Sequence, residues 1–245
     1  MEGYEAATYG ELWASIYDNE WGRFFDLDQS VARLFELAGD GPALELAIGT
    51  GRVALPLKER GVEVHGIDIS EAMVARLREK QGGNDIPVTM GDFAEVGVDG
   101  RYPLIYLVFN TLFALTTQAD QVRCFRNVAS HLTADGSFLI EAFVPDLSRF
   151  DRHQRVEAMR VRLDQVVLEA SRHDPVEQSI DTQVVTLAQS ETTLHPIHIR
   201  YAYPSELDLM AELAGMRLRS RHGGWNQEPF TSDSRSHISV YEKPS

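Results

Sequence analysis

Two glycines and an acid are spaced in this sequence as a nucleoside-binding site requires. Gly49 and Gly51 follow an apolar run at 43–48, and the segment after them has the periodicity of an amphipathic helix. A glycine turn lets a ligand approach the main chain closely, and the start of the next helix offers unbonded N–H groups. Asp68 lies 19 residues after Gly49, at the end of a second apolar run. A carboxylate at this spacing can accept hydrogen bonds from ribose hydroxyls, so the pattern predicts a nucleoside-binding βαβ unit.

A second acid and an amide fall at comparable places further along the chain. Asp92 and Phe93 follow a short apolar run at 86–90, and Asn110 follows the run at 103–109. Such positions lie on the edge where open parallel sheets bind ligands. Asp92 could accept a hydrogen bond from an exocyclic amine while Phe93 covers a ring. A turn aspartate beside a core phenylalanine is an equally good interpretation of this pair.

Strands and helices must alternate to bring these residues to one edge of a sheet. We expect parallel strands at 43–48, 62–67, 86–90, 103–109 and 137–143. Helices are expected between them, one capped by Ser70 and one at 118–132, and a later helix is capped by Ser205. Two further strands at 216–221 and 237–241 close the pattern. This order is typical of an α/β protein with a doubly wound parallel sheet.

One charge and one change of pattern interrupt this order. Glu141 stands inside the fifth strand, where it either meets a buried basic group or faces the ligand cleft, and we favour the cleft. Residues 148–203 are rich in Val, Thr, Ile and Tyr in partial alternation, with segments near 159–170, 178–189 and 192–203. They predict antiparallel strands inserted after strand five. The insert, which carries His195 and His198, could cover the cleft or form an interface with a second copy.

Composition limits the class of protein. The chain has 245 residues, 43% of them hydrophobic, which suits one large domain or one domain with an insert. Its 23 basic and 37 acidic side chains give a net charge of −14, which argues against a nucleic-acid partner. The single cysteine, Cys124, excludes an intrachain disulfide, and no ligand cluster suggests a metal. Without an apolar run that could span a membrane or a secretory signal, we expect a cytoplasmic protein.

Two nucleoside cofactors fit the glycine turn. The spacing Gly49-x-Gly51-x-x-Ala54 matches a loosened dinucleotide fingerprint, which leaves an NAD(P)-dependent oxidoreductase as one hypothesis. Glu45 argues against it, because the first strand of a dinucleotide site normally keeps small apolar residues. No second mononucleotide-binding half is evident either. A non-catalytic binding protein of the same fold is a further hypothesis.

Taken together, the motifs resemble those of the class I S-adenosylmethionine-dependent methyltransferases. They are residues 45–52 (ELAIGTGR), 66–70 (GIDIS), 91–93 (GDF) and 108–110 (VFN), in the order found in that family. The resemblance covers roughly residues 40–145 and implies a Rossmann-like, seven-stranded sheet whose last two strands form a hairpin. The sequence departs from the family at Ala47-Ile48, where many members have glycine and a small residue.

The resemblance also implies roles for individual residues. Gly49 and Gly51 would approach the methionine and ribose side of S-adenosylmethionine, and Glu45 would steady that loop or the amino group of the cofactor. Asp68 would bind the ribose hydroxyls. The other implied cofactor contacts are Ile69 and Phe93 beside the adenine, Asp92 on its amine, Phe109 and Asn110 near the methyl group, Met73 in the helix after Asp68, and Tyr17 near the N-terminus.

The N-terminal region is similar, more loosely, to that of small-molecule N-methyltransferases acting on nucleotide-linked amino sugars or on glycine. Tyr17-Asp18 resembles their lid tyrosine, and residues 1–40 predict two helices. We therefore expect a lid at 1–40 and a cofactor-binding core at 41–147 and 204–245. The insert at 148–203 would cover the substrate or form a homodimer interface.

The expected reaction is methyl transfer to a small-molecule acceptor. Most of the rate of an in-line displacement can come from holding nucleophile and methyl group at close range. An amine needs only to arrive unprotonated, and we slightly favour it. A hydroxyl needs a general base, for which Glu141, His195 and His198 are the candidates.

Overall fold

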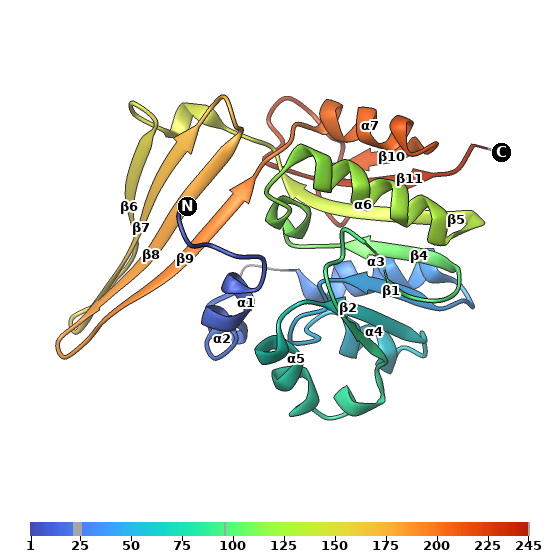
Figure 1. The fold of residues 1–245 in the computed structure, drawn as a ribbon, viewed down its shortest axis with the longest axis horizontal. Helices are drawn as coiled ribbons and strands as arrows, with labels where there is room; N and C mark the ends of the chain where they lie inside the picture. The colour runs from blue at the N-terminus through green and yellow to red at the C-terminus, as the bar shows by residue number, and fades with distance from the viewer. Residues whose placement is uncertain (22–25, 96, 245) are drawn as a thin grey trace.

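The computed structural model describes residues 1–21, 26–95 and 97–244, and the side chain of Trp21 lies outside this description. Within these residues the strands form two sheets (Figure 1). The first sheet has seven strands in the order β10-β11-β5-β4-β1-β2-β3, and the second has four in the order β6-β7-β8-β9. The expected fold class, a doubly wound seven-stranded sheet with an antiparallel insert after strand five, is confirmed.

The seven-stranded sheet is parallel except at its hairpin edge. Its strands are β1 (Ala43–Leu46), β2 (Val64–Asp68), β3 (Val88–Met90), β4 (Tyr102–Leu107), β5 (Leu132–Phe143), β10 (Arg217–His222) and β11 (Ser236–Glu242). β1 pairs in parallel with β2 and β4, and β11 runs antiparallel to both β5 and β10. The carboxyl ends of β1, β2 and β4 therefore share one edge, as the sequence predicts.

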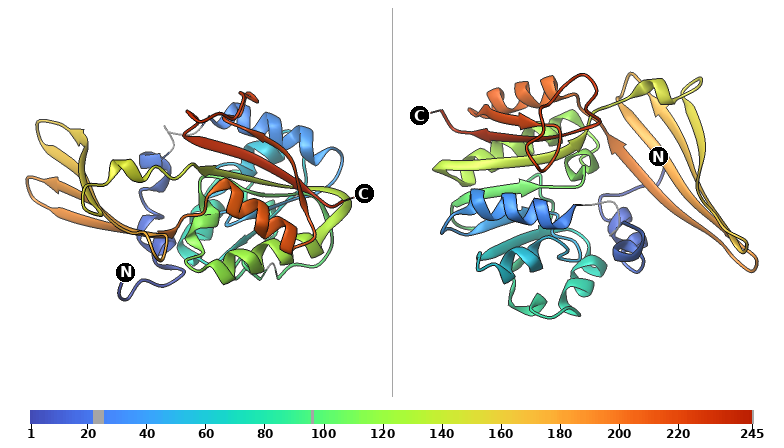
Figure 2. Two further views of the ribbon diagram at one scale, coloured as in Figure 1. Left: turned by 90° about the horizontal axis from the view of Figure 1, so that it is seen from above. Right: turned by 180° about the vertical axis from the view of Figure 1, so that it is seen from behind.

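Helices cover both faces of this sheet. α3 (Leu27–Ala38), α4 (Ala54–Glu59) and α5 (Glu71–Arg78) contribute to the apolar cluster on one face, and α6 (Gln118–His131) and α7 (Pro204–Leu213) to that on the other. The view from above shows α3 and α7 on opposite sides of the strands (Figure 2). Cys124 of α6 is fully buried in the second cluster and packs there with its apolar neighbours. None of the helices in the described ranges has both the length and the apolar character that a membrane crossing needs.

Local signals predicted some helix ends correctly and others not. The Ser70 side chain accepts a hydrogen bond from the Met73 N–H, which confirms the predicted cap of α5. The predicted cap at Ser205 is wrong, because α7 begins at Pro204 without a side-chain cap. Proline suits a first helical position, where an N–H would lack a partner anyway. The expectation of two helices at 1–40 is also wrong, since α1 (Thr8–Trp13), α2 (Tyr17–Trp21) and α3 lie there; residues 22–25 are outside the description.

The insert is a meander of four antiparallel strands. β6 (Gln154–Val161), β7 (Gln165–Asp174), β8 (Ser179–Ala188) and β9 (Thr192–Arg200) pair in sequence order. The segment expected at 159–170 is in fact the end of β6, a tight turn and the start of β7. Apolar residues continue across that turn, as at Leu163, so the sequence alone does not mark it. The chain also contains short 3-10 helices at η1 (Gly83–Asp85), η2 (Thr111–Ala114) and η3 (Leu147–Arg149).

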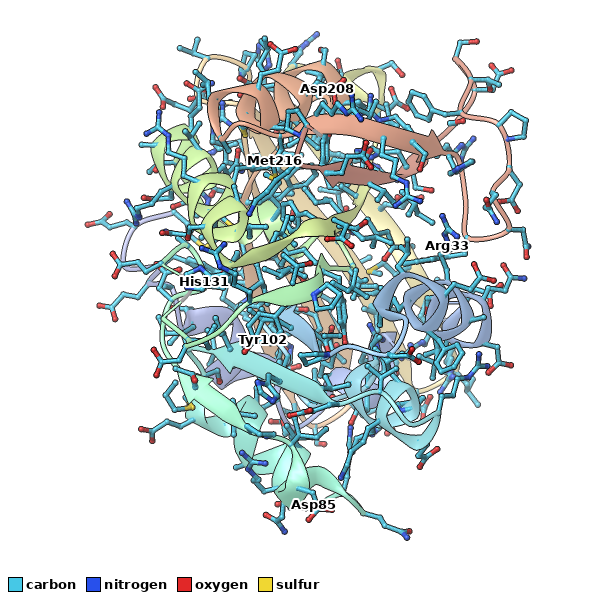
Figure 3. All side chains as sticks on the ribbon, turned by 90° about the vertical axis from the view of Figure 1, so that its right-hand side faces the viewer. Arg33, Asp85, Tyr102, His131, Asp208 and Met216 are labelled. Atoms are coloured by element: carbon cyan, nitrogen blue, oxygen red, sulfur yellow. The ribbon has the colours of Figure 1, made fainter. Side chains whose placement is uncertain are left out.

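Buried polar contacts connect the insert to the core. Arg200, at the end of β9, donates to Gln121 of α6 at 2.7 Å and to Glu206 of α7 at 2.8 Å. Earlier in β9, the Pro196 carbonyl accepts the indole N–H of Trp13 of α1 at 3.2 Å. The helices α1 and α2 thus lie between the insert and the core (Figures 1 and 2). The opposite edge, where Tyr102 begins β4, faces away from them (Figure 3).

Candidate active site

The turn after β1 adopts left-handed backbone conformations at three residues. Ala47, Gly49 and Gly51 have φ values of 55°, 56° and 73°. A Cβ on Gly49 would meet only the Ala47 carbonyl, at 3.9 Å, so the space beside Gly49 is open to a ligand. A Cβ on Gly51 would lie 2.3 Å from the Leu77 side chain. The small size of Gly51 therefore serves the packing of α5 against the turn.

Asp68 lies directly beside Gly49. Its Oδ2 accepts the Gly49 N–H at 2.7 Å and its Oδ1 accepts the Ser70 N–H at 2.8 Å. The residue is buried, and burial raises the pKa of its carboxyl group, whereas the bonded N–H groups oppose that rise. Ile69, the next residue, exposes 38% of its surface. The carboxylate and an apolar side chain thus lie together at the end of β2, beside the glycine turn, although neither is among the residues that line the cavity described below.

Three other predicted cofactor contacts have structural partners of their own. Asp92 accepts the Ala94 N–H at 2.8 Å, and Phe93 packs in the core cluster of the α6 face. This is the arrangement of a turn aspartate beside a core phenylalanine. Met73 is buried against Trp13 of α1 in a third apolar cluster. None of the three is among the residues that line the cavity described next.

A small cavity of about 30 Å³ lies between the glycine turn, the end of β4 and α2. This volume is enough for roughly one water molecule. It is lined by Tyr17, Glu45, Ala47, Ile48, Gly49, Thr50, Arg52, Val53, Val108, Phe109 and Thr111. Four of the predicted cofactor contacts, Tyr17, Glu45, Gly49 and Phe109, therefore meet here.

Arg52 is the residue at this cavity that sequence reasoning missed. Its guanidinium carbon lies 4.4 Å from the centre of the Phe109 ring and 5.1 Å from that of Tyr17. Its Nη2 also donates to the Tyr17 hydroxyl at 3.4 Å. A cation held between two aromatic faces gains cation–π attraction from both. The available signal was the arginine that follows Gly51, but nothing in its spacing indicates which side chains would surround it.

Glu45 is a buried acid at the end of β1. Its side chain accepts the Tyr106 hydroxyl at 3.0 Å. Burial raises the pKa of Glu45 to about 8, against the opposing effects of the Tyr106 hydrogen bond and the charge of Arg52. The carboxyl group is therefore mostly protonated at neutral pH.

Replacing Glu45 with glutamine is expected to reduce the pH dependence of stability. The folded chain binds this proton more tightly than the unfolded chain, because the pKa is about 8 rather than 4.5. The free energy of unfolding should therefore fall as pH rises from about 4.5 to about 8, where ionisation favours the unfolded chain. Thermal unfolding measured across this range should show a smaller fall in Tm for Glu45→Gln than for the wild type. Equal falls in the two proteins would contradict this prediction.

Glu141 is held by two donors rather than left open to a ligand. Its Oε2 accepts the Phe109 N–H at 2.8 Å, and its Oε1 accepts the Trp225 indole N–H at 3.1 Å. Burial raises the pKa of Glu141, while these donors and the charge of Arg52 oppose the rise. The side chain of Asn110 is also hydrogen-bonded within the protein, since its Oδ1 accepts the Phe143 N–H at 2.7 Å.

The N-terminal helices are fastened to the glycine turn. Asp18 accepts the Thr50 hydroxyl at 2.7 Å and forms an ion pair with Lys80, also at 2.7 Å. Lys80 in turn donates to the Thr50 carbonyl at 2.8 Å. Burial raises the pKa of Tyr17 to about 12, so this phenol stays protonated above the cavity.

The two candidate histidines of the insert lie elsewhere. The His195 ring packs against the indole of Trp13, with ring centres 4.9 Å apart. His198 contacts Asp181 at 2.7 Å through Nδ1. Neither residue is among those that line the cavity.

Comparisons with known proteins identify methyltransferases among the similar chains. The profile of a family described as "Methyltransferase domain" matches residues 43–136. The chain is similar to the CcbJ methyltransferase from Streptomyces caelestis, with 38% identity, a TM-score of 0.91, and coverage of 99% of this chain and 100% of that one. It is 28% identical to the cypemycin N-terminal methyltransferase of a Streptomyces species over 82% of each chain. CalS10, an amino pentose methyltransferase from Micromonospora echinaspora solved with S-adenosylmethionine bound, shares the fold: 18% identity, TM-score 0.72, 94% and 97% coverage.

Proposed function

Because the chain belongs to the class I S-adenosylmethionine-dependent methyltransferases, we propose that it transfers a methyl group from S-adenosylmethionine to an amine of a small molecule. The ionisable groups that line the cavity are the observation that favours an amine acceptor over a hydroxyl. They comprise Tyr17, Glu45 and Arg52 among the described residues. Each of them is already engaged with a neighbouring side chain.

None of these described groups is suited to remove a proton from a hydroxyl. Tyr17 keeps its own proton, since its pKa is about 12. Glu45 is buried, and its side chain already accepts the Tyr106 hydroxyl. A hydroxyl acceptor would need a general base within hydrogen-bond reach, whereas an unprotonated amine attacks with its own lone pair. An amine acceptor therefore fits this site better than a hydroxyl.

The residues at the glycine turn suit the parts of this cofactor. The open space beside Gly49 leaves room for the main chain to meet a ligand, and Asp68 beside it would accept the ribose hydroxyls. Arg52 would bind the carboxylate of the cofactor's methionine moiety. Glu45 would face the ammonium group of that moiety, whose positive charge would favour the ionised form of this acid. When bound, S-adenosylmethionine supplies the methyl group: the lone pair of the amine would attack the methyl carbon in line while the carbon–sulfur bond breaks, and neutral S-adenosylhomocysteine would leave.

The same proposal assigns tasks to the remaining segments. The N-terminal segment, expected as a lid at 1–40, would act through α1 and α2, because Asp18 and Tyr17 hold α2 on the glycine turn. In contrast, α3 packs on the sheet with the core. The insert at 148–203 would cover the acceptor, since β9 contacts both α1 and η2.

Ligand binding and turnover together test this proposal. At about 100 times its dissociation constant a ligand adds about 2.7 kcal/mol to stability, so S-adenosylhomocysteine should raise Tm by roughly 5–10 °C. NAD and NADP should leave Tm unchanged. The next assay follows S-adenosylhomocysteine release with a panel of amino sugars, amino acids and peptide N-termini, and with matched phenols and sugars.

The outcomes of this assay separate the rival functions. We expect release with one class of amine, at a rate that rises with pH as the acceptor loses its proton. Turnover with hydroxyl compounds alone would contradict the amine assignment. A Tm shift with NAD(P) alone would favour an oxidoreductase, and cofactor binding without turnover on the whole panel would favour a non-catalytic protein.

A further inference from the structure

Three segments that are distant in sequence meet at one carboxylate. Glu141 of β5 accepts the main-chain N–H of Phe109 with one oxygen and the indole N–H of Trp225 with the other. Trp225 lies in the long connection between β10 and β11, residues 223–235. This connection is not among the segments that line the cavity. It nevertheless reaches the group that holds Phe109 in place.

The backbone at Phe109 requires such a restraint. Phe109 and Asn110 both have left-handed conformations, with φ values of 62° and 63°. Two consecutive non-glycine residues in this region are strained, and strained residues persist only where the surroundings hold them. The Glu141 carboxylate accepts the Phe109 N–H, the Glu141 carbonyl accepts the Asn110 N–H, and the Asn110 side chain accepts the Phe143 N–H. Within the turn, the Val108 carbonyl accepts the Thr111 N–H and the Asn110 carbonyl accepts the Phe113 N–H. Glu141 is thus the residue outside the turn that bonds both left-handed residues.

The consequence of this turn is the position of an aromatic ring. The Phe109 ring lies under the guanidinium of Arg52 at 4.4 Å and lines the cavity. If the turn relaxed, the ring would move, whereas Arg52 would keep its hydrogen bond to the Tyr17 hydroxyl. A carboxylate with one of its two donors removed is free to rotate away from the other. The indole N–H thus keeps Glu141 in the orientation that Phe109 needs.

We propose that Trp225 is a positioning residue of this methyltransferase. By donating to Glu141, Trp225 holds the carboxylate on the Phe109 N–H and so keeps the Phe109 ring at the cavity. The kinetic consequence rests on the proposed function, whereas the structural link between Trp225 and Phe109 does not. The connection at 223–235 is thereby part of the active site although it makes no contact with the cavity.

The first test replaces Trp225 with phenylalanine, which keeps an aromatic ring and removes the donor. A small misplacement of groups at a reaction centre can reduce the rate by up to about 100-fold. We expect kcat to fall about 10-fold while the KM for S-adenosylmethionine changes by less than about twofold. Asn226→Ala is the matched control, because Asn226 is the next residue and is exposed. Circular dichroism verifies that both variants are folded at the assay temperature.

A double-mutant cycle tests whether Trp225 acts through Glu141. Glu141→Gln keeps the shape of the side chain but can offer only one oxygen to the two donors. If the effect passes through Glu141, the double variant should lose no more activity than Glu141→Gln alone. Losses that multiply would overturn the proposal, because Trp225 would then act by another route.

Hydrogen exchange provides a readout that does not need activity. NMR exchange at the Phe109 amide should accelerate about 10-fold in Trp225→Phe and in Glu141→Gln, and stay at the wild-type rate in Asn226→Ala. An unchanged exchange rate at Phe109 in Trp225→Phe would overturn the proposal. If the wild type transferred no methyl group to any amine, the proposed function would fail, and this measurement would still decide the role of Trp225.

Discussion

Replacing Asp68 with asparagine is expected to weaken the binding of S-adenosylhomocysteine about 100-fold. The two carboxylate oxygens accept the Gly49 and Ser70 N–H groups beside the glycine turn, where we propose that the ribose lies. A hydrogen bond to a charged group contributes about 1.5–3 kcal/mol, and a loss of about 2.7 kcal/mol corresponds to two decades in affinity. Asparagine has one acceptor oxygen and no charge, so it cannot serve both the turn and the ribose. Titration calorimetry measures the change directly.

The control for Asp68→Asn is the same substitution at a surface aspartate that is distant from the site. Asp85 projects from the surface at the far end of the molecule (Figure 3) and pairs only with Lys58 among the described residues. Asp85→Asn should bind S-adenosylhomocysteine like the wild type. If folded Asp68→Asn also bound within about threefold of the wild type, the assignment of Asp68 to the ribose would be abandoned.

Replacing Arg52 with glutamine is expected to reduce kcat/KM about 100-fold, mainly through the KM for S-adenosylmethionine. The substitution removes the cation that lies on the Tyr17 and Phe109 rings. It also removes a charge that opposes the raised pKa values of Glu45 and Glu141, so both acids should become harder to ionise. Removing one partner of a buried ion pair lowers the free energy of unfolding by about 3–5 kcal/mol. Arg52 is only partly buried, so we expect the lower part of that range or less.

Two further variants show which property of Arg52 matters. Arg52→Lys keeps the charge but loses the planar group that stacks on both rings, so it should retain an intermediate affinity. Arg60→Gln removes an exposed charge just past the end of α4 and should behave like the wild type. Steady-state kinetics, together with calorimetric titration of S-adenosylhomocysteine, distinguishes the three variants Arg52→Gln, Arg52→Lys and Arg60→Gln. Wild-type affinity in Arg52→Gln would show that the methionine carboxylate is held elsewhere.

Local signals predicted the architecture and one pair of site residues. The glycine turn and Asp68 belong to one βαβ unit, so the residues between them set their separation, and the structure joins them by a 2.7 Å hydrogen bond. Serine before the expected helix at 71 similarly became its cap. Such features depend on neighbours within about 20 residues, which a sequence displays directly.

Contacts between distant segments escaped the same reasoning. Glu141 was expected to face either a basic group or the cleft, and its actual partners are an indole 84 residues later and a main-chain N–H 32 residues earlier. Phe93 was a candidate for the adenine, and in the structure it belongs to the core cluster of the α6 face. Nothing in the spacing of these residues distinguishes an inward-facing side chain from one at the edge of the sheet.

The sequence by itself determined the order of strands and helices, and with it the edge where the glycine turn, Asp68 and the end of β4 meet. That order follows from hydrophobic periodicity and from the right-handed connection of parallel strands, which are properties of each segment and its neighbour. Only the tertiary structure decided that Arg52 lies between Tyr17 and Phe109, and that Trp225 holds Glu141. The partner of a buried charge is chosen by packing of the whole chain, because any nearby donor can satisfy it and proximity arises only on folding.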